Sequence, residues 1–221
     1  MAPDLPRETP GESENRTERR RRETHESLLD ATLRLLIDNG AAGFSVTDVV
    51  DLADVAGGTF YNHFGDRDEA IREVVSRIIA QNAGQVEMLA GDDPLDGFVA
   101  LWLVNANRSL RDLEFARMVD NVIHSHLWPL GDSAPPALVM LHEARTVGRI
   151  HCTPEQVELC YLIVAGAASG HAKASLSGVT DALGELSDTI VATMVSTLGV
   201  DGEAMAALIE RMTAELAGVE V

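Results

Sequence analysis

The residues best suited to a defined chemistry are five arginines within residues 16–22, which contain a single glutamate. Guanidinium groups carry a permanent positive charge and bind phosphate oxygens through paired hydrogen bonds. Elsewhere the balance is reversed, because the formal charge of the protein is −18 and residues 73–221 hold 8 basic and 20 acidic side chains. A phosphate-binding surface is therefore expected at this basic arm, with a solvated charge run as the alternative.

The other reactive side chains form no recognisable catalytic or metal site. The protein has seven histidines, but His124 and His126 are two apart on an expected helix and point in nearly opposite directions. Cys152 and Cys160 have the spacing of neither a zinc site nor a disulfide framework. We expect no enzyme, no metal and no cofactor; a cryptic enzyme that uses His151 or Cys152 is an alternative, although no third partner for nucleophilic catalysis is visible.

The composition is typical of a globular protein, with 46% hydrophobic and 24% charged residues. Residues 1–15 are rich in Pro, Glu, Ser and Thr and are expected to form a disordered tail. The first leucine run begins at Leu28 after polar residues, so no secretory signal peptide is expected and the expected location is cytoplasmic. The longest uncharged apolar stretch, residues 159–170, is shorter than the roughly 18 residues that span a membrane.

The spacing of apolar residues predicts helices throughout. A first helix is expected from Thr17 to a stop at Asn39-Gly40, and a capping box at Ser45-Val-Thr-Asp48 opens a short helix that ends near Asp54. A short segment over residues 56–63 follows. Further helix starts are indicated at Asp66 with Glu69, Asp93-Pro94, Ser133 with Pro135, Thr153-Pro154 with Gln156, Thr180 and Asp201. No strand pattern is present, so the predicted fold class is all-α with about ten helices.

The two short helices joined by a tight turn have the layout of a helix-turn-helix, whose second helix enters the major groove of DNA. Phe44-Ser-Val-Thr-Asp-Val-Val-Asp-Leu-Ala-Asp-Val-Ala-Gly-Gly-Thr-Phe-Tyr-Asn-His-Phe64, followed by Gly-Asp-Arg-Asp-Glu-Ala-Ile71, closely resembles the signature of the tetracycline-repressor (TetR) family of transcriptional regulators. Residues 59–64 correspond to the family's Thr-Leu-Tyr-x-His-Phe core. Arg67 stands where the family usually has a phosphate-binding lysine. The resemblance covers about residues 17–75.

The resemblance implies which side chains of this chain contact DNA. Thr59, Tyr61 and His63 would bind the DNA backbone together with Arg67, while Asn62 is the exposed side chain best able to pair with an adenine edge, with plain solvent exposure as the alternative. With the arm and the start of the first short helix, the expected set is Arg20, Arg21, Arg22, Ser45, Thr47, Gly57, Gly58, Thr59, Tyr61, Asn62, His63 and Arg67.

Two departures from the family pattern concern the same segment. Asp54 occupies the turn position that is usually glycine, and aspartate tolerates the positive φ expected there better than most residues do. No Lys or Arg occurs between Arg34 and Arg67. Affinity for DNA is therefore expected to depend on the basic arm, which precedes the first helix and could reach a neighbouring minor groove.

A ligand pocket is compatible with residues 95–149, where polar side chains are interleaved with apolar ones. The family resemblance, rather than the pattern itself, favours a cavity over an ordinary helical core. The expected ligand-binding residues are Trp102, Asn105, Met118, Asn121, His124, Trp128, Met140, His142 and Arg145. The guanidinium of Arg145 could fix a carboxylate ligand, or it could pair with Glu143 or lie on the surface.

The expected helix from Pro154 to about Ser177 is apolar on nearly all sides, so part of its surface needs a cover from a second subunit. Gly166, Gly170 and Ala174 recur every four residues and would let a partner helix approach closely. Leu186, Ile190 and Met194 belong to the seam of the following helix. In the TetR family two such late helices from each subunit form a four-helix interface, so we expect a homodimer, with a buried hairpin as the alternative.

Three segments are therefore predicted: a disordered tail (1–15), a three-helix helix-turn-helix DNA-binding domain with its basic arm (16–65), and a larger helical ligand-binding and dimerisation domain (66–221). The expected function is that of a ligand-responsive repressor, which binds a palindromic operator in double-stranded DNA and is released by an unknown small molecule. The alternative is a small-molecule-binding homodimer with weak or no DNA binding. No contact with a membrane is expected.

Overall fold

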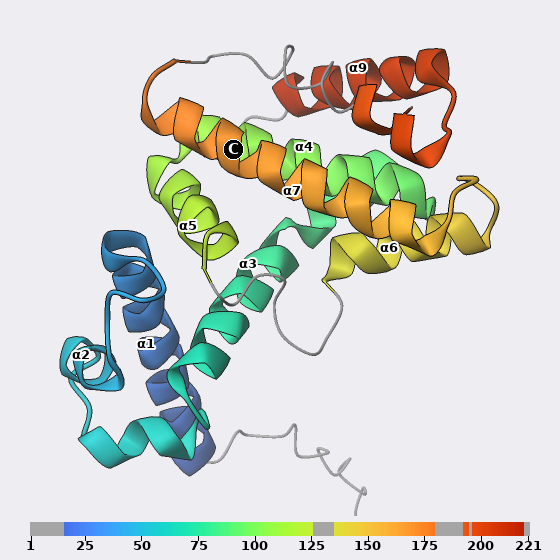
Figure 1. Cartoon of the computed structure of the whole chain (residues 1–221). Coiled ribbons are helices and arrows are strands. Elements are labelled where there is room, and N and C mark those ends of the chain that lie inside the picture. The colour runs from blue at the N-terminus through green and yellow to red at the C-terminus, as the bar shows by residue number, and fades with distance from the viewer. Residues whose placement is uncertain (1–15, 126–134, 180–191, 195, 219–221) are drawn as a thin grey trace, which may run out of the picture.

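The computed structural model describes residues 16–125, 135–179, 192–194 and 196–218. In chain order its elements are α1 (Arg16–Asn39), α2 (Val46–Leu52), the 3-10 helix η1 (Gly57–Asn62), α3 (Arg67–Ala90), α4 (Pro94–Arg111), α5 (Leu113–Ile123), α6 (Pro136–Thr146), α7 (Pro154–Leu176) and α9 (Gly202–Gly218). These ranges contain no strand, and the predicted all-α class is confirmed (Figure 1). No helix within them is both long and apolar enough to cross a membrane.

Local chemistry sets several helix boundaries as predicted. At α2 the backbone N–H of Asp48 donates to the Ser45 hydroxyl (3.3 Å), and the Asp48 carboxylate accepts from the Ser45 N–H (2.7 Å), which is a complete capping box. Thr153 and Gln156 form a second capping box at α7. Asp54 has a φ of 53° in the turn after α2, as predicted for a position that usually requires glycine.

Other boundaries differ from the prediction. The Asp66 carboxylate caps α3 by accepting from the Glu69 N–H (2.7 Å), but the Glu69 carboxylate accepts from the N–H of Gly65 (2.5 Å) instead of closing a box with Asp66. A start at Asp112, whose carboxylate accepts from the Phe115 N–H, was not predicted. The predicted starts at Ser133 and Thr180 lie outside the described residues, as does the tail of residues 1–15.

The N-terminal core is formed where α1, α2 and η1 pack against the first half of α3 and against α5. Phe60 and Leu28 are completely buried at its centre. From α5, the buried side chains of Phe115, Met118 and Val122 belong to this core. This core therefore takes side chains from both sides of the boundary expected at residue 65.

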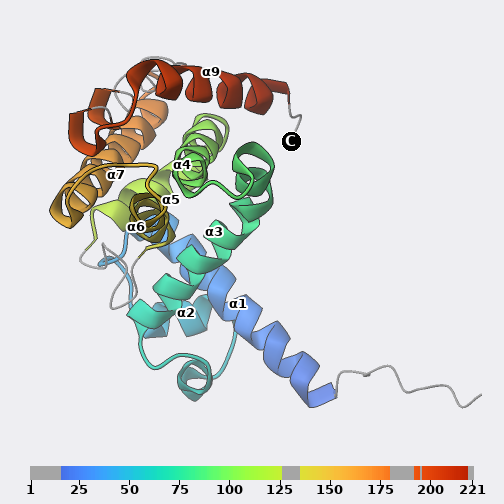
Figure 2. The same ribbon diagram turned by 90° about the vertical axis from the view of Figure 1, so that its right-hand side faces the viewer.

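The second core lies between α4, α6, α7 and α9, which stack above the N-terminal helices in Figure 1. The two cores are bridged by α3, which begins beside α1 and ends beside α4, as the view in Figure 2 also shows. Asn121 of α5 adds a polar tie, because its side-chain amide donates to the carbonyl of Leu36 at the end of α1 (2.8 Å). The helix-turn-helix is thus attached to the larger helical part through α3 and α5.

Candidate DNA-binding face and ligand cavity

The element expected to enter the major groove is a 3-10 helix rather than an α-helix. Gly57 and Gly58 open η1, and both are poor helix formers. Phe60 fixes η1 to the N-terminal core: it is fully buried and packs against the ring of Phe64, with 5.2 Å between the ring centroids. A fixed Phe60 directs its neighbours Tyr61 and Asn62 outward into solvent.

Most of the residues predicted to contact DNA lie at the surface. Thr47, Gly57, Gly58 and Asn62 are exposed, and Tyr61 has 63% of its surface accessible. Thr59 and His63 are half-buried at the edge of the same element. Ser45 is exposed as well, but its hydroxyl is engaged by Asp48. The structure thus brings these side chains together around α2 and η1.

Arg67, the expected phosphate ligand, is already held by the protein. Its Nη1 donates to the carbonyl of Phe44 (2.6 Å), its guanidinium lies over the Phe44 ring, and its Nη2 is 3.3 Å from the carboxylate of Asp68. These contacts join the start of α3 to the residue before the α2 cap. A phosphate would have to share this guanidinium with the protein.

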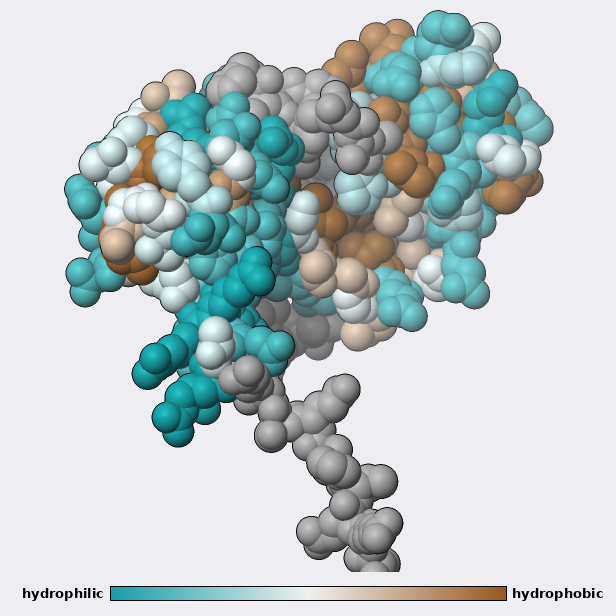
Figure 3. Space-filling view, turned by 90° about the horizontal axis from the view of Figure 1, so that it is seen from below, coloured by the Kyte–Doolittle hydropathy of each residue, from teal (hydrophilic) through white to brown (hydrophobic). Residues whose placement is uncertain are grey.

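The basic arm forms the first turns of α1, which agrees with the predicted helix start at Thr17; the prediction that the arm precedes this helix is wrong. Residues 16–22 form the exposed first turns of α1 and extend away from the helical body (Figure 2). In Figure 3 the strongly hydrophilic side chains at this end of α1 project from the molecule. The positive charge of Arg21 acts on His63 at the end of η1, so the arm lies on the same side of the molecule as the recognition element.

His25 and His63 connect α1 to η1 and α3, and of these two only His63 was among the predicted DNA-binding residues. The ring of His25 stacks on Phe64 (5.0 Å between centroids) and lies 5.4 Å from the ring of His63. Nε2 of His25 is 2.6 Å from the carboxylate of Glu73 on α3. His25 follows Arg21 by one helical turn, and this spacing is the sequence signal that could have placed it beside the arm.

The surface around α2 carries negative charge. Asp48, Asp51 and Asp54 are all exposed, and hydrogen bonds from the Ser45 hydroxyl and N–H lower the pKa of Asp48 below its usual value. These three carboxylates repel DNA phosphates. Any electrostatic attraction of DNA phosphates must therefore come from the arginines in the first turns of α1.

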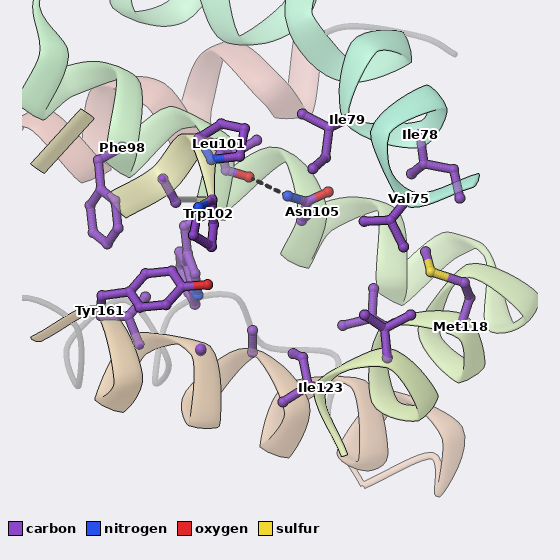
Figure 4. A pocket seen from close by; sticks show the side chains of 18 of the residues that line it. Val75, Ile78, Ile79, Phe98, Leu101, Trp102, Asn105, Met118, Ile123 and Tyr161 are labelled. Atoms are coloured by element: carbon purple, nitrogen blue, oxygen red, sulfur yellow. Dashed lines mark hydrogen bonds between the residues drawn. The ribbon is translucent and has the colours of Figure 1, made fainter. Parts of the chain in front are cut away.

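A cavity of about 160 Å³ lies at the junction of the two cores (Figure 4). Its wall contains Trp102, Asn105 and Met118 of the predicted ligand set. The remaining residues of the wall are mostly apolar and were not predicted. In a sequence, a leucine or valine that lines a cavity looks the same as one in a packed core. The wall residues that were not predicted include Val75, Ile78, Ile79, Phe98, Leu101, Phe115, Val122, Tyr161, Val164 and Ala168.

The remaining predicted ligand residues do not line this cavity. Asn121 binds the end of α1, and Met140 packs beside Gly97 in the second core. His124 and His142 pair at the surface with Asp120 and Glu158. Arg145 is exposed and donates to the carbonyl of Cys152 (2.9 Å), so the surface alternative holds for this residue. Trp128 lies outside the described residues.

Asn105 belongs to a hydrogen-bonded chain that reaches α3. Its Oδ1 accepts from Nδ2 of Asn82 (2.8 Å), and Oδ1 of Asn82 accepts from Arg108 (3.2 Å). Asn82 is buried on α3, and the guanidinium of Arg108 lies 4.3 Å from the ring centroid of Phe115. The cavity wall is thus hydrogen-bonded directly to the helix that supports the DNA-binding face.

One face of α7 is apolar and exposed. Leu159 and Leu162 each have 51% of their surface accessible, and Gly166 and Gly170 continue this face with nothing within 4 Å of an added Cβ. Ala174 is half-buried further along the helix. Met194, predicted for the same interface, is completely buried in the second core, so it is not available to a partner. Leu186 and Ile190 lie outside the described residues.

Gly58→Ala should raise the free energy of unfolding by about 0.4–1 kcal/mol, because an added Cβ meets nothing and the unfolded chain loses freedom. If glycine at this position lets a DNA backbone approach closely, the same variant weakens DNA binding. Gly84→Ala, on an exposed turn of α3, is the control and should change stability alone. Chemical denaturation and DNA titration measure the two effects; a destabilised Gly58→Ala protein would contradict the prediction.

Burial, and then the positive charges of His25 and Arg21, lower the pKa of His63 below its usual value of 6.5. The unfolded chain therefore binds this proton more readily, and stability is lost as the pH falls below about 6.5 and through the pKa of the folded state. Between about pH 7.5 and 5.5 the thermal midpoint of His63→Gln should fall less than that of the wild type. An equal fall in both proteins would refute this assignment.

Comparison with known proteins agrees with this arrangement. Residues 28–74 match the family model described as bacterial regulatory proteins, tetR family. No curated protein matches the sequence.

Similar solved structures include RolR in complex with resorcinol (18% identity, TM-score 0.54, 87% of this chain and 96% of that chain). A second is SmeT, the repressor of the Stenotrophomonas maltophilia multidrug efflux pump SmeDEF (17%, 0.56, 80% and 92%). A third is a TetR family transcription regulator from Marinobacter aquaeolei VT8 (16%, 0.54, 89% and 96%). At these identities the similarity establishes the fold. The chain is therefore similar to TetR-family regulatory proteins in two respects: residues 28–74 match the family's N-terminal model, and the chain as a whole, with its larger helical part after that segment, shares the fold of these solved structures.

Proposed function

We propose that the protein is a homodimeric transcriptional repressor that binds a palindromic operator and is released from it by a small molecule. In this proposal residues 16–65 bind DNA, and the cavity between the two cores binds the effector. The exposed face of α7 forms part of the dimer interface.

The observation that carries the proposal is the sharing of side chains between the N-terminal core and the cavity wall. Val75 and Ile78 of α3 and Phe115, Met118 and Val122 of α5 belong to both. A molecule in the cavity would touch the same side chains that support η1 from within. Because close-packed cores respond to changes of even one methylene, occupancy would change how α3 and α5 hold the helix-turn-helix.

The proposed mechanism needs two spacings of the recognition elements in the dimer. Without effector, the elements sit at the roughly 34–36 Å that separates successive major grooves on one face of DNA. An effector that binds more tightly to the dimer with a second spacing stabilises that state and so lowers the affinity for DNA. The size of the effect equals the difference between the effector's binding free energies for the two states, typically about 1–3 kcal/mol. The bridging helix α3 transmits the change.

Two of the similar structures support the regulatory part of this proposal. RolR was solved with the single-ring compound resorcinol, and SmeT is named as a repressor. The fold of this chain is therefore compatible with both the binding of a small ligand and repression.

The second candidate is a ligand-binding homodimer with weak or no DNA binding. The exposed carboxylates of Asp48, Asp51 and Asp54 beside the recognition element favour it, since they repel phosphate. The helical arginine arm favours the repressor. Selection of genomic or random DNA by the purified protein at about 0.1 M salt separates the two. Enrichment of a palindrome supports the repressor, and no enrichment by a folded dimer supports the second candidate.

Replacing Arg20, Arg21 and Arg22 with alanine should weaken binding to all DNA sequences and reduce the slope of log affinity against log salt concentration, because fewer counterions are released. The matched control replaces Arg111, Arg117 and Arg145, which are exposed on the helical body and carry the same total charge. DNA titrations over a range of salt concentrations compare the two triple variants. Equal slopes in both would argue against a role for the arm.

Leu162→Glu should dissociate the dimer, because it buries an unpaired carboxylate in the apolar face of α7. Met88→Glu is the control, since Met88 has 69% of its surface accessible on α3, away from that face. Sedimentation equilibrium should give a monomer for the first variant and a dimer for the second. A dimeric Leu162→Glu protein would remove α7 from the proposed interface.

A further inference from the structure

The cavity wall specifies a class of ligand. We propose that the cavity binds a neutral, mostly apolar molecule of about the size of one aromatic ring, with a single hydrogen-bond acceptor. This inference rests on the proposed effector site and goes further by stating the size, charge and polarity of the effector.

Size is the first argument. A cavity of about 160 Å³ is close to the roughly 150 Å³ of an engineered apolar cavity that binds benzene. The aromatic side chains of Phe98, Trp102 and Tyr161 lie together at one end of the cavity, while Val75, Ile78 and Met118 form the other end (Figure 4). A flat ring fits between the aromatic side chains, and a short alkyl substituent fits the aliphatic end.

Charge is the second argument. Among the described residues that line the cavity, none has an ionised side chain. Burial raises the pKa of Tyr161, which is therefore neutral near pH 7. The guanidinium of Arg108 is occupied by the Phe115 ring and by Asn82, and it is not part of the wall. A carboxylate or ammonium group in the cavity would lose its hydration without gaining a counter-charge.

Hydrogen bonding is the third argument. The Oδ1 of Asn105 accepts from Asn82 and its Nδ2 donates to the carbonyl of Leu101, so this amide is largely satisfied within the protein. Trp102 is 7% exposed, and its buried Nε1–H has no hydrogen-bond partner among the described residues. A buried donor without an acceptor loses its hydrogen bonds to water and gains none in return, which is unfavourable. Trp102 lines the cavity, so a ligand hydroxyl or carbonyl oxygen that reaches this Nε1–H would remove the penalty.

The test uses compounds built on one methylbenzene ring: the neutral toluene, 4-methylphenol, 4-methylbenzyl alcohol and 4-methylbenzamide, and the ions 4-methylbenzylammonium and 4-methylbenzoate, which match the last two neutral compounds in size. Calorimetric titration of the full chain without DNA should show binding of toluene and 4-methylphenol, and binding of each ion at least ~100-fold weaker than that of the neutral compound of its own size. Ala168→Leu, which fills the cavity, should abolish binding, whereas Ala80→Leu on the exposed face of α3 should leave it unchanged. Ions that bind as well as the neutral compounds of their own size, or toluene and 4-methylphenol that do not bind, would overturn the inference.

Trp102→Phe tests the hydrogen bond and keeps the aromatic wall. The variant should weaken the binding of 4-methylphenol by about 5–10-fold, which is the usual contribution of one neutral hydrogen bond. The affinity for toluene, which makes no such bond, should stay nearly unchanged. Equal effects on both compounds would remove Trp102 as the donor. None of these titrations involves DNA, so they test the proposed class of ligand alone. The selection of DNA sequences tests the repressor proposal alone, and each proposal can therefore fail without the other.

Discussion

The packing of α3 into both hydrophobic cores, together with the position of α5 between the N-terminal core and α7, is the constraint on which the remaining structure depends. Val75, Phe115 and Met118 contact the N-terminal core on one side and the cavity on the other. A protein interior has crystal-like density, so these side chains cannot move in the N-terminal core without changing the shape of the cavity. The helix-turn-helix consequently has no independent support: its buried Phe60 rests on the same core that the cavity borders.

Charge imposes a second constraint, which concerns how DNA can approach. The protein has a formal charge of −18, and α2 presents Asp48 and Asp51 beside the recognition element. In the part of the chain that the structure describes, only the first turns of α1 offer a dense group of exposed arginines, and they lie next to His63 at the end of η1. A phosphate backbone is therefore attracted to one end of the N-terminal domain and repelled from the rest of the protein, which restricts the orientation of the complex.

Features set by neighbouring residues were predictable from the sequence, and features set by distant packing were not. The caps at Ser45 and Thr153 and the positive φ of Asp54 follow from a few adjacent side chains. By contrast, the exposure of Arg145 and the burial of Met194 depend on how whole helices are rotated against one another. The same limit applies to the cavity, where only three predicted residues line a wall made mostly of ordinary apolar side chains.

The polar contact between Asn82 and Asn105 limits how α3 can move. Asn82 is buried, and its amide links α3 to the cavity wall on α4 and to Arg108. If α3 slid gradually, these buried groups would lose their partners before finding others, and each unsatisfied group costs about 1–3 kcal/mol. Intermediate positions of α3 are therefore less stable than the starting and final positions, in which the buried groups have partners. In the proposed repressor, a helix restrained in this way would respond to an effector by changing the populations of two discrete arrangements, one bound to DNA and one released from it.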